Sequence, residues 1–146
     1  MNEKEVKAEE LFKNKFNCVQ AVLGVFCEEL GLDCKTALKI STGFGSGCRK
    51  GEVCGAVAGA VMAIGLARGY CEQNDAIQKA VCYCMTENFI NKFISERESI
   101  VCRELLGYRK DEESLRIENI KDGVHWKACL GYVKSAVKIA EGLLNE

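Results

Sequence analysis

Apolar residues recur at helical spacing along most of the chain, and no stretch alternates apolar and polar residues long enough to predict a strand. Glycine and asparagine separate these segments, and proline is absent. The pattern predicts helices over residues 3–13, 18–30, 34–41, 53–68, 74–97, 111–121 and 125–144, with a short turn at CRELLG after Ser99. We therefore expect an all-α protein: a single domain over residues 1–146, formed by a bundle of about six to seven helices with a glycine-rich loop.

Residues at the ends of these segments support the helix boundaries. Asn17 and Asp33 are N-cap types, because their side-chain oxygens can accept hydrogen bonds from the first free amides of a helix. Gly31, Gly69 and Gly123 follow periodic segments and are typical of helix ends.

The segment GFGSGCRKGEVCGAVAGAVMAIG places two cysteines beside a glycine-rich turn and a helix of small apolar residues. The apolar run 53–67 is too short to cross a bilayer and predicts a buried core helix. Gly55, Gly59 and Ala63 share one face of this helix, so a neighbouring helix can approach its backbone closely. That approach would bring another helix start, such as that of Cys18, near Cys54. In the alternative interpretation the glycines only permit tight packing, and Cys54 is buried like an alanine.

Composition and charge exclude several classes of function. Hydrophobic residues make up 48% and charged residues 28% of the chain, which is typical of a globular protein. The 20 basic and 21 acidic residues leave a net charge of -1, which argues against a nucleic-acid partner. The charged amphipathic start and the short apolar run predict a cytoplasmic protein without a membrane partner. Exposed apolar helix faces favour a homodimer.

The chain contains ten cysteines, a high density for a protein expected in a reducing compartment. Disulfides are therefore neither needed nor favoured, and the cysteines are expected to be core residues, metal or cluster ligands, or redox groups. No C-x-x-C knuckle is present, so any shared site must be assembled from separate helices. Cys27 and Cys84 lie within apolar stripes and are predicted to be buried, inert thiols. The stripe of the helix 74–97 comprises Ile77, Ala80, Val81, Cys84 and Met85.

Cysteines at helix starts are the candidates for chemistry, because the partial positive charge of the free amides there favours thiolate over thiol. Cys18, Cys54, Cys102 and Cys129 lie at or near the predicted helix starts. Cys34 follows Asp33 and also meets this criterion, so the criterion alone does not select four.

Other residues with chemical potential lie near these cysteines. His125 precedes Cys129 by one helical turn and could complete a metal site or tune the Cys129 thiol, although a partly exposed histidine beside Trp126 is the favoured interpretation. Trp126 is predicted to be a packing anchor. Arg49 and Lys50, beside Cys48, are interpreted as solvated loop charges.

Several segments of the chain match a known family. They are FNCVQAV around Cys18, STGFGSG, CGAVAG from Cys54, VCRELLGY around Cys102 and WKACLGYV around Cys129. In these segments the chain resembles the C_GCAxxG_C_C family, whose members are called redox-active largely because of their cysteines. The resemblance implies that Cys18, Cys54, Cys102 and Cys129 are the four shared cysteines. The chain departs from the family in having six more, of which Cys48 stands in the glycine turn.

From these observations we expect the four shared cysteines to converge. They would bind an iron–sulfur cluster of the [2Fe–2S] type, or form a dithiol/disulfide relay in which Cys54 and Cys102 perform the chemistry, exchanging electrons with a redox partner protein. The alternative is a non-catalytic carrier of zinc or another soft metal that uses the same thiolates. A third interpretation is a structural interaction domain with buried thiols. The sequence does not decide between them, or whether the protein is an enzyme.

Overall fold

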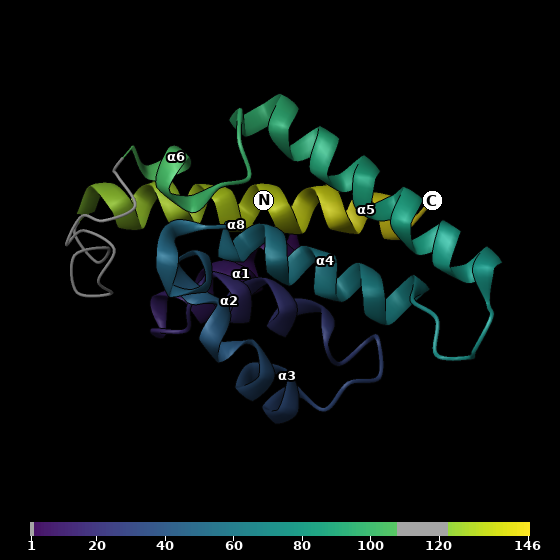
Figure 1. Cartoon of the computed structure of the whole chain (residues 1–146). Helices are drawn as coiled ribbons and strands as arrows, with labels where there is room; N and C mark the ends of the chain where they lie inside the picture. Colours follow the sequence, from purple (N-terminus) through teal and green to yellow (C-terminus); the bar gives the residue numbers. More distant parts are fainter. Residues whose placement is uncertain (1, 108–122) are drawn as a thin grey trace.

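The computed structural model describes residues 2–107 and 123–146, and within them the protein is built from α-helices with no strand (Figure 1). The helices are α1 (Glu3–Lys13), α2 (Cys18–Phe26), α3 (Cys34–Ser41), α4 (Gly55–Arg68), α5 (Ala76–Arg97), α6 (Cys102–Leu106) and α8 (Gly123–Leu144). Two short helical turns, η1 (Thr42–Phe44) and η2 (Gly47–Gly51), lie between α3 and α4. The all-α class is confirmed. The helix expected at 111–121 lies outside the described residues.

The predicted caps stabilise the starts of α2 and α3. The Asn17 side chain accepts a hydrogen bond from the Gln20 amide, and the Gln20 side chain accepts one from the Asn17 amide, which completes a capping box. Asp33 accepts hydrogen bonds from both the amide and the hydroxyl of Thr36. Gly31 has a φ of 80°, a left-handed conformation that turns the chain from α2 towards α3.

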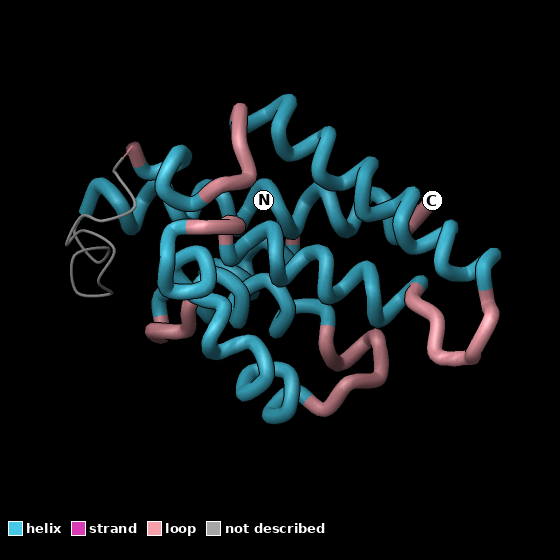
Figure 2. Tube along the Cα trace, in the orientation of Figure 1, coloured by secondary structure: helices cyan, strands magenta, loops and turns pink. Residues whose placement is uncertain are grey.

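Helix α4 lies in the core as predicted, between α2, α5 and α8 (Figures 1 and 2). Ala56, Ala60, Ala63 and Ile64 are fully buried. Its glycine face contacts α2: a Cβ atom at Gly59 would lie 2.8 Å from the carbonyl oxygen of Val19. Among the described helices, none combines the length and the apolar character needed to cross a membrane.

Helix α5 differs from the prediction because much of its first half is exposed. Phe89 and Phe93 are fully buried and stack on each other, whereas Ile77 is 80% exposed. The predicted apolar stripe is wrong: Ile77, Ala80, Val81 and Cys84 are exposed, and Met85 is half-buried. The start of α5 projects beyond the C-terminal end of α4 (Figure 1), while Cys82 and Met85, further along its first half, pack against the core.

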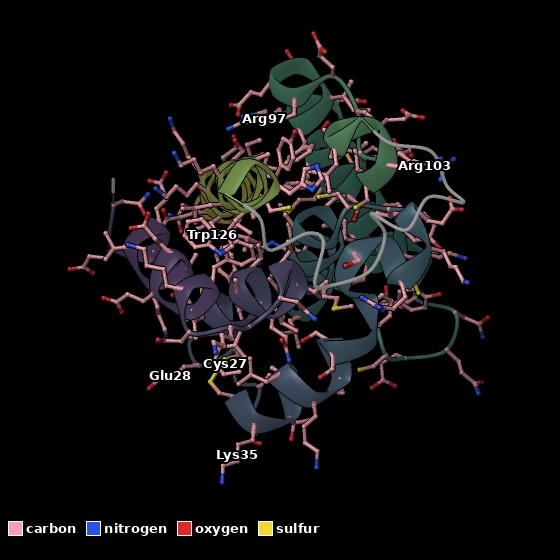
Figure 3. The ribbon with its side chains drawn as sticks, turned by 90° about the vertical axis from the view of Figure 1, so that its left-hand side faces the viewer. Cys27, Glu28, Lys35, Arg97, Arg103 and Trp126 are labelled. Atoms are coloured by element: carbon pink, nitrogen blue, oxygen red, sulfur yellow. A yellow bond between two sulfur atoms is a disulfide. The ribbon has the colours of Figure 1, made fainter. Side chains whose placement is uncertain are left out.

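Cys27 and Cys34 form a disulfide, contrary to the prediction that Cys27 is an inert thiol and that disulfides are not favoured (Figure 3). Helix α2 ends at Phe26, earlier than expected, with Cys27 at its C-cap. The left-handed turn at Gly31 then brings the first residue of α3 back towards Cys27, with the two Cα atoms 5.6 Å apart. That separation lies within the usual range for a disulfide. The bond therefore joins the end of α2 to the start of α3.

The close contact of α4 with α2 predicts opposite effects for two alanine substitutions in α4. Gly59→Ala should lower the free energy of unfolding by about 1–3 kcal/mol, because the added methyl group meets the backbone of α2. Gly65→Ala is the matched control: nothing lies within 4 Å of its added Cβ, so it should raise the stability by about 0.5–1 kcal/mol. Urea denaturation followed by circular dichroism measures both. Equal effects of the two variants would contradict the packing described.

The disulfide predicts that oxidised protein is more stable than the Cys34→Ser variant. A cross-link over a sequence separation of 7 should contribute about 2–3 kcal/mol, because it restricts the unfolded chain. The Cys71→Ser variant, altered at an exposed cysteine, should unfold like the parent protein. Denaturation in the absence of reductant tests the difference, and parent and Cys34→Ser proteins of equal stability would refute it.

Candidate functional site

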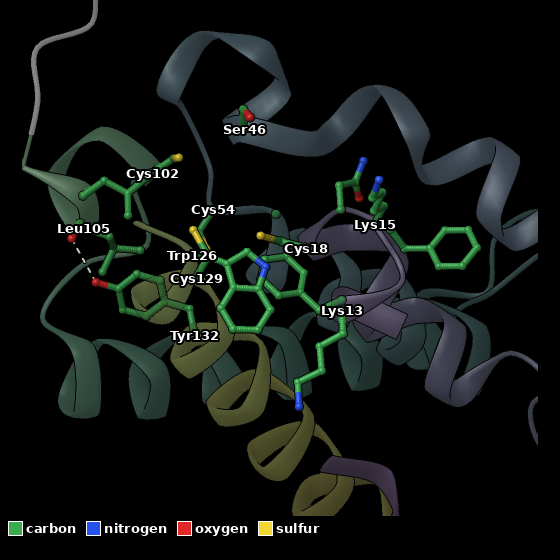
Figure 4. Close-up of a pocket in the computed structure, with 15 residues that line it drawn as sticks. Lys13, Lys15, Cys18, Ser46, Cys54, Cys102, Leu105, Trp126, Cys129 and Tyr132 are labelled. Carbon is green, nitrogen blue, oxygen red and sulfur yellow. Dashed lines mark hydrogen bonds between the residues drawn. The ribbon is translucent and has the colours of Figure 1, made fainter. Parts of the chain in front are cut away.

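Four cysteines from four helical elements line a single pocket of about 440 Å³ (Figure 4). They are Cys18, Cys54, Cys102 and Cys129, the four singled out from the sequence. Cys54, Cys102 and Cys129 are buried, and Cys18 is half-buried. The structure thus brings together thiols that are up to 111 positions apart in the chain, from 18 to 129. Their chemical role stays a prediction at this point.

Backbone pairing positions Cys54 and Cys102. The Cys54 amide donates a hydrogen bond of 2.7 Å to the carbonyl of Ile100, and the Cys102 amide donates one of 2.6 Å to the carbonyl of Glu52. These bonds enclose an isolated antiparallel bridge between Val53 and Val101. The bridge was not anticipated from the sequence, because a single pair of residues leaves no alternating pattern.

Cys18 is placed by the close approach of α2 to the first turn of α4. A Cβ atom at Gly55 would lie 2.9 Å from Val19 Cγ2 and 3.0 Å from Cys18 Cβ. Only glycine therefore leaves room for the start of α2 at this distance. This is the close approach expected from the small-residue face of α4.

Cys129 is not at a helix start, which corrects the criterion used to select it. Helix α8 begins at Gly123, so Cys129 lies in its second turn, where the free amides of the first turn no longer act on it. A different interaction stabilises its thiolate. The Cys18 thiol donates a hydrogen bond to Cys129, which lowers the pKa of Cys129 and raises the pKa of Cys18 well above its usual value.

Cys54 is the N-cap residue of α4 and is 4% exposed. Burial raises the pKa of Cys54 to about 12, although the backbone amides of Val57 and Ala56 donate hydrogen bonds that act in the opposite direction. Desolvation is the larger effect. The Cys54 thiol is thus protonated at neutral pH unless a cation binds to its sulfur.

The glycine-rich turn packs directly against Cys102. Gly47 has a φ of 63°, and a Cβ atom there would lie 2.8 Å from Cys102 Cβ and 2.5 Å from the Glu52 amide nitrogen. Arg103 donates 3.0 Å hydrogen bonds to the Gly51 carbonyl and the Glu52 carboxylate, which hold η2 against α6. Sequence spacing alone did not reveal this contact.

The remaining candidates do not join the four cysteines. Cys48 is exposed on η2, and the half-buried His125 is not among the residues that line the pocket. Trp126 does line it and stacks on Phe12 at 5.4 Å between ring centroids, which confirms its packing role. Tyr132 was missed, although it stands one helical turn after Cys129; its hydroxyl donates to the Leu105 carbonyl at 2.9 Å.

The pocket offers sulfur donors and no carboxylate among its described lining residues. Such a donor set suits soft metals and iron–sulfur clusters. Over residues 2–107 and 123–146, no three His, Cys, Asp or Glu side chains are grouped so as to hold a single metal ion.

The hydrogen bond between the two thiols predicts how substitution at Cys18 affects Cys129. In reduced, chelator-treated protein, Cys18→Ala should raise the pKa of Cys129, because the thiolate loses its donor. A higher pKa would slow alkylation of Cys129 at neutral pH, because a smaller fraction of its thiol would be ionised. Peptide-level mass spectrometry of alkylation against pH measures this rate. Cys18→Ser retains a donor and should show a smaller effect; unchanged profiles in both variants would contradict the assignment.

Comparison with known proteins identifies the family of the chain. The family model C_GCAxxG_C_C, described as "putative redox-active protein", matches residues 16–143. No curated protein and no solved structure matches the chain. Since the matched segment contains all four pocket cysteines and most of the chain, this protein belongs to the C_GCAxxG_C_C family.

Proposed function

We propose that the pocket binds an iron–sulfur cluster of the [2Fe–2S] type through Cys18, Cys54, Cys102 and Cys129, and that the protein transfers electrons to or from another redox protein. The observation that supports this proposal most strongly is the convergence of four thiols from separate elements on one pocket. Four thiolates are the ligand set of most such clusters.

The local environment of the thiols is compatible with this cluster. Burial disfavours free thiolates in the pocket, as the pKa of Cys54 of about 12 indicates, and a bound metal centre would supply the compensating positive charge. The amides of Ala56 and Val57 already donate to the Cys54 sulfur, and hydrogen bonds of this kind adjust the potential of a cluster. When bound, the cluster supplies one-electron transfer, while the protein holds the four ligands and shields them from solvent.

A single zinc ion in the same pocket is less well supported. A single ion needs its thiolates within a few ångströms of one another. No group of three ligands placed to hold one ion occurs in the described part of the chain. A cluster inserts its own iron and sulfide atoms between the thiolates and therefore tolerates wider spacing.

A thiol/disulfide function is the second candidate, and the hydrogen bond between Cys18 and Cys129 favours it. In that mechanism the Cys129 thiolate is the nucleophile, and forming its bond to Cys18 transfers two electrons and the Cys18 proton to a disulfide oxidant, which is reduced to one thiol and one thiolate. The sequence suggested Cys54 and Cys102 for this chemistry. Burial makes Cys54 a poor nucleophile at neutral pH, so the geometry favours the other pair.

Purification without oxygen should distinguish the two functions. We expect brown protein with visible absorption, containing about two iron and two sulfide per chain, the composition that defines a [2Fe–2S] cluster. Cys54→Ala should lose most of the absorption and the iron. Cys84→Ala, which alters an exposed cysteine outside the pocket, should retain both.

Colourless, iron-free protein would refute the cluster. In that case, a loss of two thiols on mild oxidation, with a Cys18–Cys129 peptide pair found by mass spectrometry, would support the disulfide function. Zinc bound by a redox-inert protein would support the carrier alternative.

A further inference from the structure

The pocket extends well beyond the sulfur atoms. Its volume of about 440 Å³ lies in the range of small-molecule sites. In Figure 4, Lys13 and Lys15 lie on the opposite side of the Cys18 and Cys54 sulfur atoms from Cys102. The pocket thus continues from the cysteines towards the connection between α1 and α2.

Aromatic side chains form the wall of this second region. Phe12 from α1, Phe16 from the α1–α2 connection and Trp126 from α8 all line the pocket. Phe12 is 8% exposed and stacks on Trp126 with an interplanar angle of 25°. This contact holds the indole in place, so a flat ligand would meet a rigid aromatic surface.

The charged residues that line the pocket are all positively charged. Lys13 and Lys15 are included among the fifteen described lining residues, and no Asp or Glu is. Lys13 forms an ion pair with Glu9, at 3.7 Å, and Glu9 lies closer to Lys134, at 2.9 Å. The Lys13 ammonium is therefore only partly balanced. A pocket lined by cations and not by carboxylates, beside an apolar wall, favours an anion with an apolar body.

We propose that the aromatic end of the pocket binds a small anionic molecule with a flat aromatic body, beside the cysteine sulfurs. The aromatic rings contact the flat face of the ligand, and Lys13 and Lys15 attract its negative group. This binding is independent of whether the cysteines bind a cluster or form a disulfide.

Naphthalene-2-carboxylate and its neutral analogue naphthalene-2-carboxamide are matched probes for this site, because they differ chiefly in charge. Isothermal titration calorimetry of the full chain, purified without oxygen, should show that the carboxylate binds about fivefold more tightly at low salt. Lys13→Gln/Lys15→Gln should remove this preference and leave carboxamide binding unchanged. Lys35→Gln/Lys39→Gln, which removes two exposed lysines of α3 that do not line the pocket, is the control and should retain the preference. Trp126→Leu should weaken both probes, and circular dichroism should verify its fold.

Absence of carboxylate binding, or equal affinity of the parent protein for the two probes, would overturn the proposal. So would an equal loss of the carboxylate preference in the Lys35→Gln/Lys39→Gln control. If Trp126→Leu does not remain folded, the carboxylate preference of the lysine variants alone still tests the proposal. The cluster is assessed separately by iron content and colour. Colourless protein that binds the carboxylate would leave this inference intact, whereas brown protein that does not bind it would overturn only this inference.

Discussion

The close approach of α2 and α4 is the contact on which the rest of the site depends. Gly55 and Gly59 present bare backbone to Val19 and Val22, at distances where a Cβ atom would overlap with α2. This packing places the first turn of α2 beside the N-cap of α4. Cys18 and Cys54 are therefore neighbours as a consequence of helix packing, before any interaction between their sulfur atoms.

Two opposing electrostatic effects then determine the state of the thiols. Removal from water favours the neutral thiol and dominates at Cys54. A hydrogen bond from a neighbouring thiol favours the thiolate and dominates at Cys129. The hydrogen bond thus lowers the pKa of Cys129 and raises the pKa of Cys18, so loss of both protons is disfavoured. A positively charged occupant would offset the cost of burying all four thiolates.

The helices and the convergence at Cys18 and Cys54 could be predicted because their causes are local in sequence. The caps Asn17 and Asp33 and the spacing of Gly55 and Gly59 act within one or two turns. The isolated bridge beside Cys102, by contrast, depends on contacts about fifty residues apart, which periodicity does not report.

The disulfide and the exposure of α5 were missed for related reasons. The pairing of Cys27 with Cys34 depends on the left-handed turn at Gly31, which the sequence showed only as a helix end. The first half of α5 has the periodicity of a packed helix, yet Ile77, Ala80 and Val81 are exposed because its start projects beyond the end of α4. Position in the fold, rather than cysteine count, separates the ten cysteines. Cys48, Cys71 and Cys84 are exposed, Cys82 is half-buried on α5, and Cys27 and Cys34 form a disulfide. The other four line one pocket, in which Cys54, Cys102 and Cys129 are buried and Cys18 is half-buried. A redox centre needs both proximity and shielding from solvent, and this is the physical basis for proposing these four.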